Sequence, residues 1–295
     1  MIVSKGKSRA GMTLVHLFFI LFSLACVIPL LAIVSISFSD EAAIAMEGYK
    51  LIPTKISLTA YQLVLKYPTQ LLNAYKISII VTVLGTLGGL YVQATMAYVL
   101  SRRAYKYRNF LAFYMFFTML FNGGLIPSYI LITRYLHMGD TIWVLFVPGL
   151  VSAWNIILLR TFFQGIPESL VESAKIDGAK ELRIFFSIMV PLSKPSLATI
   201  ALFISVGLWN DWWNALIYIN RADLVPLQYL LHKLIMQNEF LVQQAQNMPG
   251  IDVKSLPSET YRMAMCILAA GPMLFAYPFF QKYFVRGLTI GGVKG

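Results

Sequence analysis

The stretch Glu168–Pro195 reads ESLVESAKIDGAKELRIFFSIMVPLSKP, and it is a polar segment between two long apolar ones. Pro167 suits the start of a helix, and Gly178 can adopt a positive φ and end one. We therefore predict a short helix near 168–177, a turn at Gly178 and a second helix near 181–189. Three residues separate the triplet 172–174 from Gly178, and nine residues separate Gly178 from the run 188–191. The distinctive residues of this spacing are Glu172, Ser173, Ala174, Asp177, Gly178, Ile188 and Pro191.

The composition around this stretch is typical of a membrane protein. Of 295 residues, 58% are hydrophobic and only 13% are charged, against about 25% charged in a soluble domain. Roughly 20 apolar residues cross the hydrocarbon as a helix, and in lipid a helix pairs all of its own backbone groups. We predict an all-α integral membrane protein, one domain over 1–295 with a loop at 164–196. The six predicted transmembrane helices are 14–38, 77–100, 110–133, 141–163, 197–219 and 263–281.

The net charge of +11 indicates topology rather than nucleic-acid binding. If loop 164–196 is cytoplasmic, both termini and the 101–108 loop lie on the same side. That side then carries 15 of the 24 basic residues and four of the 13 acidic ones, and the other side is neutral. This is the distribution that the positive-inside rule describes. We predict a multi-pass membrane chain with both termini in the cytoplasm, and no nucleic-acid partner.

Helix breakers interrupt several of the predicted spans. Pro29, Pro127, Pro148, Pro272 and Pro278 are each expected to kink a helix by removing a backbone hydrogen bond. Two groups of glycines are expected to let helices approach closely. These are Gly85, Gly88 and Gly89 in the second span and Gly123-Gly124 in the third. Between the fifth and sixth spans, apolar residues at helical spacing over 227–242 predict an amphipathic helix.

Polar and aromatic residues cluster in the predicted fifth span. Trp209, Asn210, Asp211, Trp212, Trp213 and Asn214 are consecutive there. A carboxylate inside a span is costly and usually faces the bundle interior or a wet cavity. Aromatic faces cover sugar C–H groups while amides and carboxylates bind hydroxyls, so we interpret the cluster as a sugar path, with Asn122 and Asn155 as further polar positions. Two alternatives stay open: an aromatic belt at the interface for the tryptophans, and interhelical hydrogen bonding for Asn155.

The spacing in the 168–195 stretch resembles the EAA loop of bacterial ABC-importer permeases, with Ser173 and Val190 as departures from the usual Ala and Leu. Trp209-Asn210-Asp211 after such a loop resembles the maltose-transporter-like carbohydrate permeases. Asn122–Tyr129, Thr141–Phe163 and Lys282–Gly295 are similar to their branch for complex or uronate-bearing oligosaccharides. Family members often continue the motif with Trp-Pro, where this chain has Asn214-Ala215. The resemblance implies a type I ABC-importer permease fold in a bacterial cytoplasmic (inner) membrane, with the short helix near 168–177 as a cytoplasmic coupling helix docked on an ATPase. The coupling residues that it implies are Glu172, Ser173, Ala174, Asp177, Gly178, Ile188 and Pro191.

The function that this resemblance implies is ATP-driven import of oligosaccharides by alternating access, without catalysis on this chain. The implied partners are a second homologous permease subunit, two ATPase subunits, an extracytoplasmic solute-binding protein, the oligosaccharide and the lipid bilayer. A Gly-Lys-Ser triplet at Gly6–Ser8 lacks the earlier glycine of a phosphate-binding loop, so we expect no cofactor here and ATP-Mg on the ATPase. The alternatives are a permease for a non-sugar solute, an ion-coupled secondary transporter and a polytopic membrane enzyme.

Two further expectations concern charge and metals. Arg134, Arg221, Lys233 and Arg262 lie at or beyond the outer ends of the predicted spans, and together they would favour an acidic, alginate- or pectin-like substrate. The three histidines and two cysteines have no metal-ligand spacing, so we expect no metal site.

Overall fold

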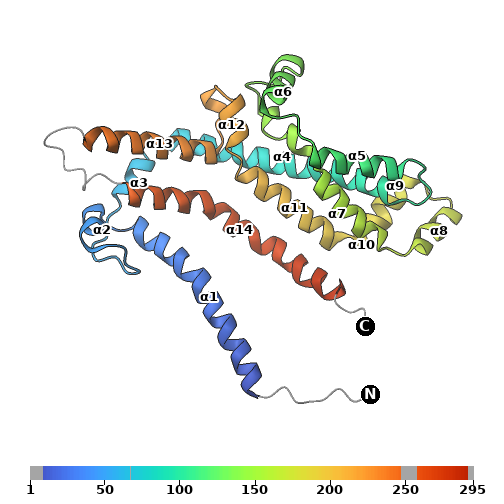
Figure 1. Cartoon of the computed structure of the whole chain (residues 1–295), viewed down its shortest axis with the longest axis horizontal. Coiled ribbons are helices and arrows are strands. Elements are labelled where there is room, and N and C mark those ends of the chain that lie inside the picture. Colours follow the sequence, from blue (N-terminus) through green and yellow to red (C-terminus); the bar gives the residue numbers. More distant parts are fainter. Residues whose placement is uncertain (1–8, 67, 247–257, 292–295) are drawn as a thin grey trace. The chain divides into compact units, whose positions relative to one another are not determined.

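The computed structural model describes residues 9–66, 68–246 and 258–291, and most of these residues are in helices (Figure 1). In that part the only extended pairing is an isolated bridge between Ser39 and Ile56. The α-helices are α1 Arg9–Ser37, α2 Glu41–Glu47, α3 Thr59–Val64, α4 Pro68–Ser101, α5 Arg108–Leu120, α6 Leu125–Ile130, α7 Ala153–Gln164, α8 Glu168–Ile176, α9 Glu181–Ile184, α10 Val190–Leu192, α11 Lys194–Trp209, α12 Trp213–Tyr218, α13 Leu227–Gln246 and α14 Glu259–Gly291. Short π and 3₁₀ turns are η1 Leu131–Tyr135, η2 Ile142–Leu145, η3 Val147–Leu150, η4 Phe185–Met189 and η5 Ala222–Leu224.

Two compact units make up the chain. The first contains residues 1–68 and 233–271, and the second contains residues 69–232 and 272–295. In the first unit, the Glu41 carboxylate accepts hydrogen bonds from the backbone N–H groups of Glu259 and Thr260, both at 3.0 Å. Glu41 thereby satisfies donors that the start of α14 leaves without an intrahelical partner. Helix α1 exposes apolar side chains along most of its length.

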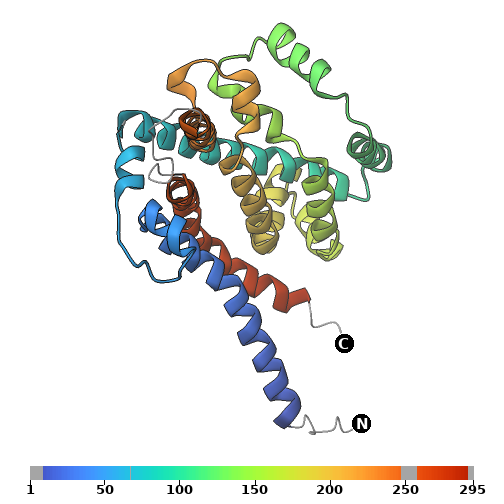
Figure 2. The same cartoon turned by 60° about the vertical axis from the view of Figure 1, so that its left-hand side comes forward.

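The second unit is a bundle in which α7 packs against α5 and α11 (Figures 1 and 2). Its core joins α4, α7 and α11 to the predicted loop 164–196. Ile156 and Leu159 of α7 and Ile200 of α11 have no exposed surface. From the loop, Val171, Ile184, Phe185 and Met189 belong to the same cluster. The loop is therefore not an appendage but a packed part of the bundle.

Few of the predicted spans are continuous helices. Gly11–Ser37 and Pro68–Ser101 are each long and apolar enough to cross a membrane. Three further candidates are bent pairs of helices: 108–120 with 125–135 at 112°, 142–150 with 153–164 at 45°, and 181–192 with 194–209 at 85°. The described residues thus offer two candidate spans, or up to five if each pair counts as one. The predicted span 263–281 lies in α14, and the structure does not describe several of its side chains. Lys5, Lys7 and residues 292–295 of the 282–295 segment also lie outside the described residues.

The breaks correct three details of the sequence analysis. Pro127 and Pro148 lie in the first turns of α6 and η3, so they begin helices rather than kink them. Gly123 and Gly124 have no neighbouring atom within 4 Å of a built Cβ, so close helix approach was the wrong interpretation. Gly124 has a φ of +87° and belongs to the break between α5 and α6.

The glycines of α4 do permit close approach, as predicted. A Cβ built on Gly85 would lie 2.4 Å from Leu208 Cδ1 and 2.9 Å from Phe146 Cβ. Because real Cβ atoms keep larger separations, α11 can pack here only against a glycine. A Cβ built on Gly89 would likewise lie 3.4 Å from Ile204 Cδ1.

Candidate functional site: a docking hairpin and a polar cavity

The predicted helix–turn–helix over 168–189 is present, and its turn has the chemistry that the sequence indicates. Helix α8 ends at Ile176, and Gly178 has a φ of +76°. The Ala179 N–H donates to the Ala174 carbonyl at 2.9 Å, and the Gly178 N–H donates to the Lys175 carbonyl at 3.0 Å. This pair of bonds with glycine in the left-handed region is a Schellman motif. It satisfies two carbonyls at the end of α8 and turns the chain toward α9.

Side-chain contacts hold the hairpin together and attach it to α4. Lys175 Nζ of α8 lies 2.7 Å from Glu181 Oε1 of α9. The other Glu181 oxygen accepts a short hydrogen bond from the Tyr98 hydroxyl of α4. The Tyr98 ring also packs on Phe185, with 5.3 Å between ring centroids. Tyr98 therefore joins a candidate span to the hairpin through both a polar and an aromatic contact.

The hairpin has an inner and an outer face, and the predicted motif residues divide between them. Val171 is buried, and Ala174 and Ile188 pack against the core cluster. Glu172, Ser173, Asp177, Gly178 and Pro191 are exposed. The outer face also carries apolar side chains that the sequence analysis did not single out: Ile176 is 86% exposed, Leu182 69% and Leu170 44%. Apolar side chains exposed to this extent beside polar ones are typical of a surface that a protein partner covers.

The aromatic cluster lies at a break between helices rather than inside one, so the predicted fifth span over 197–219 is not one continuous helix. Helix α11 ends at Trp209, Asn210 is its C-cap, and α12 begins at Trp213. The break is stable because Asp211 Oδ1 accepts the backbone N–H groups of Trp213 at 3.0 Å and Asn214 at 3.1 Å. Asp211 Oδ2 accepts the Asn214 side-chain amide. The carboxylate therefore supplies acceptors that the start of α12 needs.

A cavity of about 470 Å³ opens beside this break. Its volume is in the range of small-molecule sites, which are mostly apolar with a few convergent polar groups. Asn155 of α7 also lines the cavity, as do Leu145 and Gly149. The lining residues from the predicted cluster are Asn210, Asp211, Trp212, Trp213 and Asn214.

Two predicted path residues are not part of this cavity. Trp209 is 4% exposed and belongs to the buried core. The Asn122 side chain accepts the Gly124 N–H at 2.8 Å in the break before α6, so it stabilises a local turn. Conversely, the sequence analysis missed two residues at the cluster: His232 stacks on Trp212 with 4.4 Å between ring centroids, and Gln228 donates to the Asn210 side chain at 3.3 Å. Both are polar residues of the predicted amphipathic helix near 227–242, which is the signal that could have pointed to them.

Two of the four basic residues expected near the outer ends, Arg221 and Arg262, pair with carboxylates. Arg221 makes two hydrogen bonds to Asp223, at 3.1 and 2.6 Å, and these bonds hold the pKa of the Asp223 carboxyl below its usual range. Arg262 pairs with Glu239 at 2.8 Å and with Glu259 at 3.2 Å. Arg134 is exposed. Arg221 and Arg262 are thus neutralised and give little support to attraction of an acidic substrate.

Comparisons with known proteins are consistent with this architecture. The family described as binding-protein-dependent transport system inner membrane component matches residues 4–290. The polygalacturonan/rhamnogalacturonan transport system permease protein YtcP of Bacillus subtilis (strain 168) is 39% identical over 290 residues, which cover 98% of this chain and 100% of that protein. Protein LplC of the same organism is 40% identical over 269 residues, covering 91% and 90%. A crystal structure of a bacterial ABC transporter involved in import of the acidic polysaccharide alginate contains a chain that superposes with a TM-score of 0.79 at 31% identity, covering 95% of this chain and 100% of that one.

Proposed function

The chain belongs to the family of binding-protein-dependent transport system inner membrane components, and from this membership we infer how its parts work in transport. It is a permease subunit of an oligosaccharide ABC importer, a transport component rather than an enzyme. It functions in a membrane complex with an ATPase and a binding protein. We propose that the complex also contains a second, related permease subunit and two ATPase subunits. We further propose six spans with both termini in the cytoplasm.

In this proposal the outer face of α8 and α9 docks on the ATPase. The exposed Ile176, Leu170 and Leu182 supply an apolar contact, and the exposed Glu172 and Asp177 add charged groups at its edge. The inner face shares a core with α4, α7 and α11. A movement imposed on the hairpin by the ATPase would therefore move these helices with it, because a packed core transmits displacement rather than absorbing it.

Helix α11 would carry that movement to the substrate. It begins at Lys194, shortly after the hairpin, and its 16 residues reach Trp209, roughly 24 Å along a helix axis. The residues that follow line the cavity at the break. This direct connection from hairpin to cavity is the single observation that supports the alternating-access proposal most strongly. It also favours Asn155 and residues 210–214 as the substrate path, with the Trp212–His232 stack as an aromatic surface.

We propose an acidic oligosaccharide as the substrate. The support comes from the relatives, whose names specify polygalacturonan/rhamnogalacturonan and the acidic polysaccharide alginate. The chain itself contributes less, since Arg221 and Arg262 are paired with carboxylates. A non-sugar solute would not need the amides and tryptophans that line the cavity. An ion-coupled secondary transporter would need a relay of intramembrane ionisable residues, and among the described lining residues only Asp211 is ionisable.

The substrate class is tested with the complete transporter reconstituted in liposomes with its binding protein. We expect oligogalacturonates or alginate oligomers to stimulate ATP hydrolysis and to accumulate in an ATP-dependent manner. Neutral malto- or xylo-oligosaccharides of the same length serve as the matched control and should have little effect. Stimulation by the neutral sugars alone would refute the acidic substrate while leaving the importer assignment intact. Uptake that persists without ATP would refute the coupling proposal.

A further inference from the structure

A second cavity lies where three candidate spans end, and the substrate path does not use it. Its volume is about 500 Å³. Ser101 at the end of α4, Arg108 at the start of α5 and Gln164 at the end of α7 all line it. These residues are also the ends of the candidate spans 68–101, 108–135 and 142–164. If these candidates are the actual spans, their ends reach the membrane–water boundary, where lipid headgroups lie.

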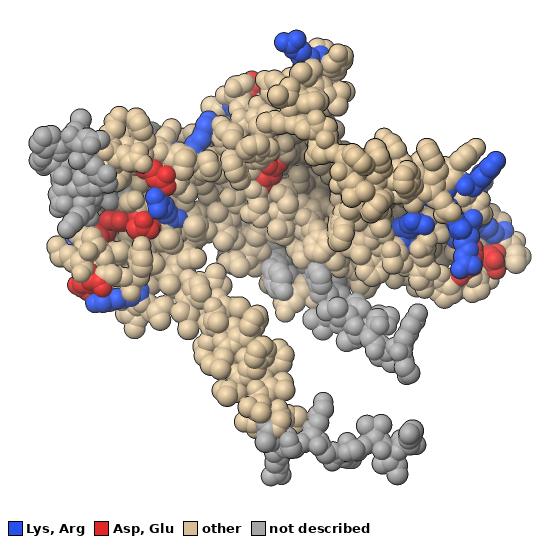
Figure 3. Space-filling view, in the orientation of Figure 1, with Lys and Arg blue, Asp and Glu red and all other residues tan. Residues whose placement is uncertain are grey.

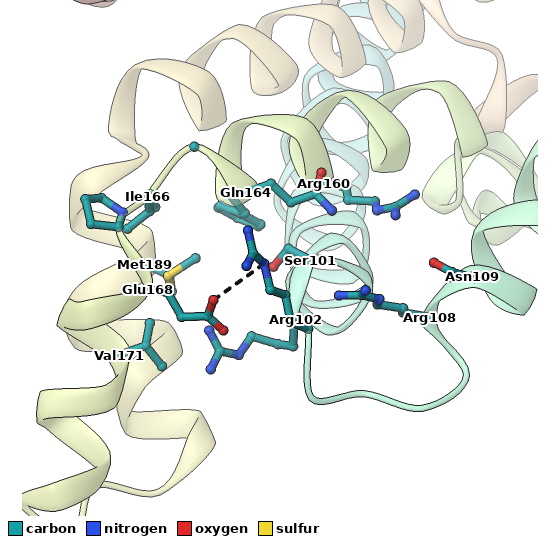
Figure 4. Close-up of a pocket in the computed structure, with 14 residues that line it drawn as sticks. Ser101, Arg102, Arg108, Asn109, Arg160, Gln164, Ile166, Glu168, Val171 and Met189 are labelled. Atoms are coloured by element: carbon teal, nitrogen blue, oxygen red, sulfur yellow. Dashed lines mark ion pairs between the residues drawn. The ribbon is translucent and has the colours of Figure 1, made fainter.

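Four arginines line this cavity and one carboxylate opposes them. Arg102 and Arg103 come from the loop after α4, Arg108 from α5 and Arg160 from α7 (Figure 4). The carboxylate is Glu168, which lies 3.5 Å from Arg103 Nε. Within the described part of the chain, Arg102, Arg108 and Arg160 have no ion-pair partner, although Arg102 also lies over the Tyr98 ring at 5.8 Å. The cavity therefore carries an excess of positive charge. Figure 3 shows Lys and Arg gathered at the end of the second unit that carries α8.

Two of these arginines have buried donors without a partner. Arg102 Nε and Arg160 Nε are both shielded from solvent and make no hydrogen bond in the described part of the structure. Buried polar groups in native proteins are nearly always satisfied, so each exception calls for an explanation. Guanidinium groups match the oxygens of a phosphate in geometry and charge. A bound phosphate-bearing group would satisfy donors that the protein leaves without acceptors.

We propose that this cavity binds the headgroup of an anionic phospholipid. Basic pockets between transmembrane helices at the membrane surface are recognised sites for such headgroups. Helix α5 extends from the cavity and exposes Phe110, Phe113 and Phe117, which gives the acyl chains an apolar surface. An acidic segment of the ATPase is a poorer occupant. The reason is that the cavity and the proposed ATPase-docking face use different residues of α8. Glu168 and the buried Val171 line the cavity, whereas Leu170 and Ile176 are on the exposed face.

The test is a titration of the purified, delipidated transporter with phosphatidylglycerol or phosphatidylcholine, followed by native mass spectrometry. The wild type should bind phosphatidylglycerol preferentially. Removing two arginines in the double variant R108Q/R160Q should weaken that binding on the order of tenfold or more. The matched control K76Q/R134Q removes the same charge from exposed residues of the same unit, outside both the cavity and the hairpin, and should bind as the wild type does. The variant R108K/R160K keeps the charge and should retain the preference for phosphatidylglycerol.

Several outcomes would overturn the proposal. These are equal binding of the two lipids by the wild type, or undiminished phosphatidylglycerol binding by R108Q/R160Q. A third is binding of inorganic phosphate that requires Arg108 and Arg160, without any preference for phosphatidylglycerol, which would identify a free-anion site. A fourth is loss of the ATPase from R108Q/R160Q with lipid binding unchanged, which would assign the cavity to that partner. If the double variant does not assemble, the single variant R108Q provides the same comparison.

Discussion

At Gly178 the backbone rather than the side-chain environment restricts the residue type. A Cβ added there would meet no atom within 4 Å, yet φ is +76°. The left-handed region is open to glycine and strained for other residues, especially β-branched ones. The Schellman bonds at the end of α8 depend on this conformation. The direction in which the outer face of the hairpin points is therefore set by one glycine.

Gly178→Val should abolish ATP-driven transport, because roughly 1–3 kcal/mol of backbone strain favours a different turn and reorients α8. Uptake and ATPase stimulation by the loaded binding protein are the measurements. Gly48→Val is a matched control: Gly48 also has a φ of +76° and no atom within 4 Å, but it follows α2. We expect the control to lose stability and keep coupling. Normal transport by Gly178→Val would rule out a role for this turn.

Asp211 is a helix cap as well as a cavity residue, and two substitutions separate these roles. Asp211→Ala removes the acceptors for Trp213 and Asn214 and should destabilise the break by about 0.5–2 kcal/mol. Asp211→Asn keeps a side-chain carbonyl that can cap. We expect transport to fall in the Ala variant and to stay near wild type in the Asn variant, measured as initial uptake at equal protein. Equal loss in both would instead assign the negative charge itself to the substrate path.

At the scale of elements, the hairpin and the bundle are connected in two physically different ways. The buried Val171, Ile184, Phe185 and Met189 make a nonpolar connection to α4, α7 and α11. Tyr98 and Glu181 make a polar one, which Lys175 extends back to α8. The nonpolar connection accounts for stability, because it contains most of the buried surface. The polar connection depends on the direction of its hydrogen bond, so it is suited to fixing the position of the hairpin relative to α4.

Tyr98→Phe tests the polar connection while preserving the ring that packs on Phe185. Loss of one hydrogen bond to a carboxylate should cost about 1.5–3 kcal/mol at most, so the complex should still assemble. We expect ATP hydrolysis to become less dependent on the loaded binding protein and transport per ATP to fall. Thr95→Val, on α4 with a hydroxyl that bonds only local carbonyls, is the control and should behave as wild type. Unchanged coupling in Tyr98→Phe would show that the nonpolar contacts suffice.

At the scale of the whole molecule, the proposed topology divides the charge unequally between the two sides of the membrane. The side proposed to be cytoplasmic carries 15 basic and four acidic residues, and the other side has equal numbers of each. An excess of basic residues in cytoplasmic loops is what the positive-inside rule describes, so this distribution supports the proposed orientation.

The orientation can be measured with single cysteines in a chain whose free Cys26 and Cys266 are replaced by serine. In intact protoplasts or spheroplasts, a membrane-impermeant maleimide should label Glu47→Cys, after α1, and spare Lys106→Cys, between α4 and α5. Both positions should be labelled once the membrane is permeabilised, which controls for exposure. Labelling of Lys106→Cys in intact cells would reverse the proposed topology and move the hairpin away from the ATPase.

The sequence by itself determined the features that depend on local chemistry. Long apolar segments must be helical in lipid because only a helix satisfies its own backbone, so the helical class follows from composition. The hairpin followed from Pro167 and Gly178, whose backbone preferences act over a few residues. The spacing around Gly178 also resembled a known loop, and the family match agrees with that resemblance.

Only the tertiary structure decided which polar residues meet. Helices α4 and α11 are apolar on nearly every side, so their sequence periodicity does not reveal which face packs and which lines a cavity. Only the structure shows that Trp209 at the end of α11 belongs to the core, that Asn155 of α7 lines the cavity with Asp211, and that Asn122 stabilises the break before α6. The arginine cavity brings together Arg102 and Arg160, far apart in the chain, through contacts among helix ends. Such juxtapositions depend on how helices pack against each other, a nonlocal property that no single segment encodes.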